Sequence, residues 1–97
     1  NNGLRKARLA WYIAIDLFNE SDLDGTIEEI NLMLDGIEQS YRDLGRDFNT
    51  QYFLKANSKK IATLLSDLNQ IELLKDMKEL DPDRREIYQS ALEDKSE

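Results

Sequence analysis

The most constraining feature of the sequence is a run of apolar residues spaced alternately by three and four positions. The run consists of Ile27, Ile30, Leu34, Ile37, Tyr41, Leu44 and Phe48. This spacing places every member on one face of an α-helix, and it is typical of helices that pack against partners in a coiled coil or an antiparallel bundle. It predicts a helix over 27–44 that buries this face.

The ends and the middle of this helix carry their own signals. Thr26 and Glu29 have the spacing of a capping box, which predicts the helix start, and Gly45 is a candidate C-terminal cap. Gly36 lies inside the helix, where glycine costs about 1 kcal/mol relative to alanine. A glycine in that position is expected where a neighbouring helix comes close.

Three further helices are predicted, over 4–19, 58–80 and 82–94. The first is apolar on nearly every side, which is typical of a buried helix. The third contains an interruption near Asn69. The last begins at Asp81-Pro82, where Asp is a favoured N-cap and Pro a favoured first residue. Residues 49–58 lack a clear period and are interpreted as a loop or a short helical turn.

The usage of β-branched residues agrees with an all-α fold. The chain contains no Val, and its 15 Leu outnumber its eight Ile and three Thr. A length of 97 residues is enough for one domain. The prediction is a single antiparallel four-helix bundle over 1–97, and the following aromatic residues are expected in its core: Trp11, Phe18, Tyr41, Phe48 and Tyr88.

The residue types that are absent exclude much chemistry. There is no His and no Cys, so the chain cannot supply a Ser-His-Asp or Cys-His nucleophile, a zinc site of the usual kind or a disulfide. Its carboxylates lie off the apolar faces, as solvated helix surfaces do. We expect a non-enzymatic protein with no catalytic residues, no metal site and no cofactor.

One segment is similar to part of a calcium-binding EF-hand loop. With Gly25 in the sixth position, Asp22 and Asp24 fall at the third and fifth positions. The twelfth position, which should be a bidentate Glu, is Asn31. A polar turn that precedes a helix accounts for the same residues.

The charge of the chain is negative and unevenly distributed. The net charge of -7 argues against nucleic-acid binding. Eight acids and no base lie between Leu9 and Tyr41. Lys55, Lys59 and Lys60 form a compact basic cluster, which either pairs with this acidic block or serves an anionic partner. Pairing within the bundle is the favoured interpretation.

No secretory signal is visible, and the longest apolar stretch, Leu9 to Ile15, is far shorter than the roughly 20 residues that cross a bilayer. A cytoplasmic location is expected, with peripheral membrane contact at most.

Several segments resemble those of the small bacteriocin immunity proteins of the enterocin A or pediocin-like type. They are the opening helix segment Trp11–Phe18, the later helix segment Ile61–Leu68, and Leu80-Asp81-Pro82 followed by Arg84–Tyr88. The last of these is similar to the start of the family's final helix, which has a leucine, a Ser or Asp, a Pro and then a Leu/Ile-Tyr pair. The resemblance implies an antiparallel four-helix bundle, although many members of the family are basic and this chain is acidic.

The resemblance also implies a function. It implies a cytoplasmic protein that protects a producer cell from its own pore-forming peptide by acting at the membrane receptor, the mannose phosphotransferase permease, or on the bacteriocin. Specificity in this family is governed by the C-terminal half. The implied partner-binding residues are Lys78, Arg84, Arg85, Glu86 and Gln89, to which the basic cluster adds Lys59 and Lys60.

Two alternatives remain beside this hypothesis. The regular spacing of the second helix also fits a generic helical interaction or oligomerisation module, although a monomer is favoured. The segment from Asp22 to Ile27 leaves a calcium-responsive module as a less favoured alternative.

Overall fold

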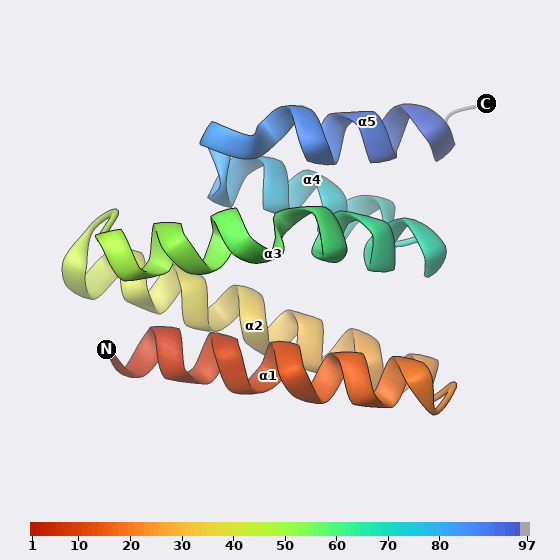
Figure 1. Cartoon of the computed structure of the whole chain (residues 1–97), viewed down its shortest axis with the longest axis horizontal. Coiled ribbons are helices and arrows are strands. Elements are labelled where there is room, and N and C mark those ends of the chain that lie inside the picture. Colours follow the sequence, from red (N-terminus) through yellow and green to blue (C-terminus); the bar gives the residue numbers. More distant parts are fainter. Residues whose placement is uncertain (96–97) are drawn as a thin grey trace. The chain divides into compact units, whose positions relative to one another are not determined.

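The computed structural model describes residues 1–95, and in that range every regular element is a helix (Figure 1). The elements are α1 (Asn2–Asn19), α2 (Leu23–Leu44), α3 (Phe48–Asp67), α4 (Ile71–Leu80), the short 3-10 helix η1 (Pro82–Arg84) and α5 (Arg85–Lys95). The all-α prediction is confirmed, with five α-helices in these residues where four were expected. The chain divides into two compact units, residues 1–51 and the part that begins at residue 52.

The first unit is built on a hairpin of α1 and α2 whose backbones come into direct contact (Figure 1). A Cβ atom added to Gly36 would lie 2.5 Å from the carbonyl oxygen of Gly3 and 2.7 Å from the amide nitrogen of Ala7. A Cβ atom added to Gly3 would lie 2.5 Å from the carbonyl oxygen of Gly36 and 2.6 Å from the amide nitrogen of Ser40. The helix expected beside Gly36 is therefore α1, and both helices require small residues at the crossing.

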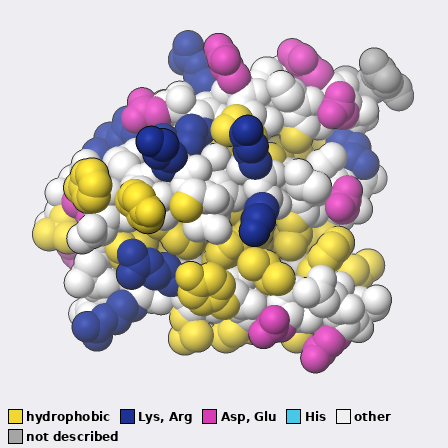
Figure 2. Space-filling view, viewed as in Figure 1, with side chains coloured by type: hydrophobic (Ala, Val, Ile, Leu, Met, Phe, Trp, Pro, Cys, Tyr) yellow, Lys and Arg dark blue, Asp and Glu magenta, His cyan; other side chains and the backbone are white. Residues whose placement is uncertain are grey.

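Only one side of α1 is buried. Trp11 is 1% exposed, whereas Leu9 is 62% exposed and Tyr12 is 58% exposed. Figure 2 shows hydrophobic side chains reaching the surface over α1, in the lower part of the view, with Lys or Arg side chains beside them. The prediction of a helix buried all round is wrong, because the apolar residues of α1 exceed what the face toward α2 can cover.

The start of α2 differs from the predicted capping box. Asp22 is the N-cap, and its side chain accepts a hydrogen bond of 3.0 Å from the amide of Gly25. Thr26 lies within the helix, where its hydroxyl donates to the carbonyl oxygen of Asp22 at 2.7 Å. An Asp is as good an N-cap as a Thr. Asp22 comes first in the chain and caps the helix, so α2 begins at Leu23.

A polar network joins the end of α2 to the start of α3. The hydroxyl of Ser40, which is fully buried, donates to Asp47 Oδ1 at 3.0 Å and lies 2.6 Å from the hydroxyl of Thr50. Asp47 Oδ2 accepts from the amide of Thr50 at 3.2 Å, which is N-cap geometry. Asn1 caps α1 and also donates from Nδ2 to the Ser40 hydroxyl at 2.9 Å. Gly45 is the C-cap of α2, as predicted, with φ 69° and ψ -150°.

The network lowers the pKa of Asp47. Burial acts to raise this pKa, but hydrogen bonds from the Thr50 side chain, the Thr50 amide and the Ser40 hydroxyl outweigh burial and hold the pKa below its ordinary value. The carboxylate therefore stabilises the folded state wherever it is ionised.

We expect Asp47→Ala to lower the free energy of unfolding by about 1 kcal/mol at pH 7, the usual cost of a lost N-cap. The stabilisation is complete above the unfolded-state pKa of about 3.9 and is lost as the pH falls through the lower folded-state pKa. The difference between the wild type and the variant should therefore shrink below about pH 4. Thermal melts followed by circular dichroism measure it, with the exposed Asp35→Ala on α2 as control. An undiminished difference at about pH 2 would contradict this account.

Of the two interpretations of 49–58, the loop is wrong, and the short helical turn is part of a longer helix, because α3 begins at Phe48 and is continuous to Asp67. The positions that it buries at helical spacing are Thr50, Leu54, Ser58, Ile61 and Leu65. Two of these five are polar, so a search for apolar periodicity misses the first half of the helix. Of the adjacent aromatic residues, Phe53 is buried whereas Tyr52 is 62% exposed.

The predicted helix over 58–80 is divided in two at the expected interruption. Asn69 has φ 60°, the amide of Gln70 donates to the carbonyl oxygen of Leu65 at 2.9 Å, and the amide of Asn69 donates to Ser66 at 3.0 Å. This pair of bonds is the Schellman motif, in which one left-handed residue ends a helix. The last predicted helix, 82–94, consists of η1 and α5.

The predicted aromatic core is confirmed in part. Trp11 and Tyr88 are buried, and Phe18 and Tyr41 are half-buried. Phe48 is 79% exposed. The reason is that α2 ends before Phe48, which begins α3 instead of continuing the apolar face of α2.

Candidate functional site: the α4–α5 groove

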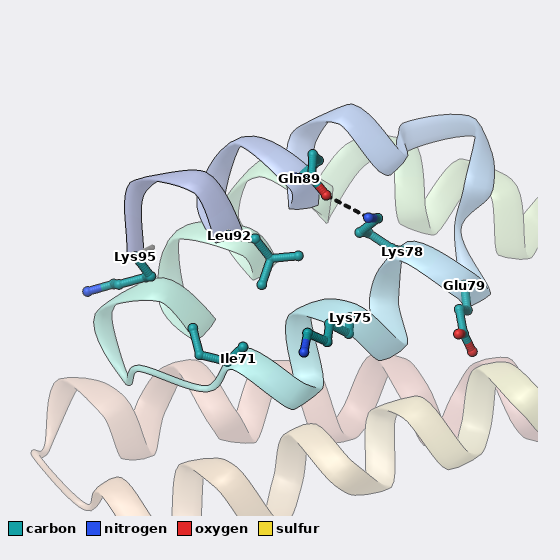
Figure 3. A pocket seen from close by; sticks show the side chains of 7 residues that line it. All are labelled: Ile71, Lys75, Lys78, Glu79, Gln89, Leu92 and Lys95. Atoms are coloured by element: carbon teal, nitrogen blue, oxygen red, sulfur yellow. Dashed lines mark hydrogen bonds between the residues drawn. The ribbon is translucent and has the colours of Figure 1, made fainter. Parts of the chain in front are cut away.

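The second unit contains a groove of about 730 Å³ between α4 and α5 (Figure 3). The residues that line this α4–α5 groove are Ile71, Lys75, Lys78, Glu79, Gln89, Leu92 and Lys95. Its volume exceeds the roughly 530 Å³ of a second hollow in the same unit. Its wall combines apolar side chains with an excess of cations, which is a composition suited to recognition of another molecule.

Helical spacing explains how each side of the groove is formed. On α4, Leu73, Leu74 and Met77 are buried, which leaves Ile71, Lys75 and Lys78 on a neighbouring face at steps of four and three. On α5, Gln89 and Leu92 are three residues apart and face the same space. The short η1 lets α5 turn back along α4, so that these faces oppose each other (Figure 1).

A hydrogen bond closes the groove at one point. Lys78 Nζ donates to Gln89 Oε1 at 2.6 Å, and both side chains are half-buried (Figure 3). Gln89 Nε2 in turn donates to Glu93 Oε1 at 3.3 Å. This bond holds the lysine side chain in one position, so the wall of the α4–α5 groove contains a fixed cation.

The charges of the groove are predominantly positive. Figure 3 shows Lys95 and Glu79 pointing outward at opposite ends, with Leu92 of α5 directed toward α4. Lys75 Nζ lies 3.6 Å from Glu72 Oε1. Both side chains are exposed, so this ion pair contributes little to stability. A partner that fits this surface would place an apolar side chain near Ile71 and Leu92 and carry acidic groups toward the lysines.

A buried polar cluster at the turn between α4 and α5 holds the two helices together. Asp81 and Tyr88 are both fully buried, and the Tyr88 hydroxyl donates to Asp81 Oδ2 at 2.7 Å. Arg84 Nε lies 3.1 Å from each carboxylate oxygen, and its hydrogen bond goes to Oδ2. Asp81 Oδ1 accepts no hydrogen bond from residues 1–95, so the nearby charge of Arg84 is its main compensation.

The role expected for Asp81 therefore needs correction. It precedes Pro82, as a helix N-cap would, but its side chain makes no capping hydrogen bond and is directed to Tyr88 and Arg84 instead. The helix start is marked by the Asp81 carbonyl oxygen, which accepts from the Arg84 amide at 3.1 Å.

The structure brings together some of the residues predicted to bind a partner. Lys78 and Gln89 face each other in the α4–α5 groove. Lys59 and Arg84 line a second, smaller hollow. The remaining three are exposed: Lys60 on α3, and Arg85 and Glu86 at the start of α5.

Sequence reasoning missed five residues of the groove. Ile71 and Leu92 were assigned to apolar faces, and Lys75, Glu79 and Lys95 were not singled out. The spacing of Ile71, Lys75 and Lys78 on one face of α4 is the signal that would have grouped them.

The calcium alternative receives no support from the local structure. Residues from Leu23 onward belong to α2, so Asp24 and Gly25 lie in a helix and not in an open loop. In the described part of the chain, no group of three or more acidic side chains is placed to hold a metal ion. Over the same residues, no helix has the length and apolar character required to cross a membrane.

No family model matches the sequence, and no curated protein and no solved structure is significantly similar to it. Over residues 1–95, the geometry is that of an all-α protein with an apolar, basic groove.

Proposed function

We propose that this chain is a non-catalytic binding protein and that the α4–α5 groove is its recognition surface. The observation that carries the proposal is the groove itself, with its apolar side chains and its fixed, half-buried Lys78. Most binding sites combine an apolar surface with a few polar groups held in position, because the apolar area supplies affinity and the polar groups supply orientation.

We further propose that this binding serves bacteriocin immunity. The support is the resemblance of the segments around Leu80-Asp81-Pro82 and Arg84–Tyr88, which form the turn and the helix that border the groove. In this proposal the chain acts from the cytoplasmic side, as a monomer with peripheral membrane contact at most. Its partner is the mannose phosphotransferase permease, the bacteriocin or both.

The proposal includes the antiparallel four-helix bundle expected of that family. The α1–α2 hairpin of the first unit and the α4–α5 hairpin of the second unit are helix pairs of the kind that such a bundle contains. Distances between spin labels placed on exposed positions of α1, α3 and α5 would test the arrangement.

The exposed lysines that line the groove are the residues to change in a functional experiment. We expect expression of the chain to protect a sensitive cell against one pore-forming peptide of a panel. Lys75→Glu with Lys95→Glu should raise the sensitivity of the cell about tenfold, since each reversed surface contact costs up to roughly 1 kcal/mol. Both side chains are exposed, so the fold should be preserved.

The matched control is Arg5→Glu with Lys6→Glu on α1, which makes the same change in charge at exposed positions outside the groove. Protection should survive in this control. Full sensitivity of the cell to every peptide would contradict immunity, and equal loss in both variants would contradict a role for the groove.

The oligomerisation alternative rests on a different surface from the one first considered. Ile30 and Ile37 are 0% exposed and Leu34 is 5% exposed within a single chain, so the apolar face of α2 offers no area to a second copy. Leu9 and Tyr12 on α1 are the exposed apolar residues that keep this alternative open. Sedimentation equilibrium distinguishes it, since a monomer leaves no role for such a module.

A further inference from the structure

A second hollow, of about 530 Å³, lies in the unit that begins at residue 52 and shares no residue with the α4–α5 groove. The residues that line this basic hollow are Lys55, Ala56, Ser58, Lys59, Arg84 and Ile87. Three of the six are cationic and none is acidic. Asp81 compensates Arg84, which leaves two lysine charges in excess.

The two lysines are placed unfavourably for the free protein. Lys55 and Lys59 are four residues apart on α3, so their side chains share one face, where like charges repel. In the described residues, neither side chain forms a hydrogen bond or an ion pair. An anion between them would convert this repulsion into attraction.

Ser58 provides a second, independent observation. It is 1% exposed and lines the basic hollow, so its hydroxyl lies at the wall of the hollow, near the two lysines of α3. A serine hydroxyl carries one donor, which a phosphate oxygen can accept.

We propose that the basic hollow binds the phosphate group of an organic phosphate. Lys55 and Lys59 supply charge, Ser58 supplies a hydroxyl donor, and the planar guanidinium of Arg84 suits the geometry of phosphate oxygens. Ala56 and Ile87 form an apolar wall beside these donors, which fits the carbon portion attached to the phosphate. The phosphate can belong to a soluble ester or to a phospholipid headgroup, and the chemistry of recognition is the same.

The test is a titration of the ¹⁵N-labelled full chain with inorganic phosphate and with glycerol 3-phosphate, against sodium chloride of equal ionic strength. We expect amide shifts to concentrate at Lys55, Ser58, Lys59 and Ile87, with glycerol 3-phosphate binding more tightly. Lys55→Ala with Lys59→Ala should weaken binding about tenfold. The control is Lys60→Ala, which removes an adjacent exposed lysine outside the hollow and should leave affinity unchanged.

Ser58→Ala separates binding from folding. Because the change removes a single hydroxyl and leaves a good helix former in α3, we expect this variant to unfold close to the temperature of the wild type. It should nevertheless bind phosphate several-fold more weakly. A loss of stability without any loss of phosphate affinity would overturn the role given to Ser58 and with it the proposed site.

The two sources of the phosphate are distinguished by co-sedimentation with vesicles of phosphatidylglycerol or of phosphatidylcholine. Binding to the anionic vesicles that depends on Lys55 and Lys59 but not on Lys60 would identify a headgroup. Site-specific binding of the two soluble phosphates without vesicle binding would identify a soluble ester. Absence of both, or equal effects of the Lys60 variant, would overturn the proposal.

Discussion

Replacing Gly36 by alanine is expected to destabilise the protein by about 3 kcal/mol, although the same replacement in the middle of most helices stabilises by about 1 kcal/mol. The sign is reversed because the added Cβ atom would lie 2.5 Å from the Gly3 carbonyl oxygen and 2.7 Å from the Ala7 amide nitrogen. Both are backbone atoms of α1, so no rotation of a side chain relieves the contact and the two helices must move apart.

Denaturant unfolding measures the effect. Gly3→Ala should cost a similar amount, since its Cβ atom meets the backbone of Gly36 and Ser40 at 2.5 and 2.6 Å. Asp35→Ala, at the adjacent exposed position of α2, is the control and should change stability little. If Gly36→Ala proved neutral or stabilising, the close crossing of α1 and α2 would be wrong.

The second large effect concerns the buried carboxylate of Asp81. Arg84→Met should cost about 3 kcal/mol, because it leaves a fully buried charge without its neighbouring cation. Tyr88→Phe should cost about 2 kcal/mol through the lost hydrogen bond of 2.7 Å to the same carboxylate. Both changes retain most of the side-chain volume, so loss of packing contributes little.

Arg85→Met is the matched control, since it removes the same type of residue at the next position, where the side chain is exposed. A double-mutant cycle adds Asp81→Asn, which removes the charge. Arg84→Met should be much less costly in that background, because no buried anion remains. Equal costs for Arg84→Met and Arg85→Met would show that the Asp81 cluster does not stabilise the turn.

The all-α fold and the ends of several helices were predictable from local sequence signals. The spacing of Ile30, Leu34 and Ile37 correctly predicted a buried face on α2, and Gly45 correctly predicted its end. The missed half of α3 shows where such reasoning stops. Thr50 and Ser58 occupy buried positions. Thr50 is acceptable there because its hydroxyl lies 2.6 Å from the hydroxyl of Ser40, a tertiary contact that no local pattern indicates.

The sequence of α1 contains a pattern of small residues that indicates its close crossing with α2. Gly3, Ala7, Ala10 and Ala14 are spaced by four, three and four residues and are all buried. Small residues at this spacing indicate a closely approaching helix as clearly as large apolar residues indicate a core. The many large apolar residues of α1 predicted a helix buried on all sides, but Leu9 and Tyr12 are exposed.

The groove was predictable in part. Lys78 and Gln89 were identified because they lie in the C-terminal half, but nothing local shows that residues eleven apart meet across two helices. That meeting depends on η1 and on the bond from Tyr88 to Asp81, seven residues earlier. The pairing of Lys55, Lys59 and Lys60 with the acidic block of the first unit stays a prediction.

The direct backbone contact between α1 and α2 also bears on the order in which the molecule acquires its structure. These helices are joined by only three residues, 20–22, so the chain closes the contact at a small entropic cost. Folds dominated by contacts between near neighbours in sequence form quickly. During synthesis the hairpin is complete once residue 44 has emerged, before α4 and α5 exist. The acidic half can then be folded while the half that carries both basic surfaces is still being made.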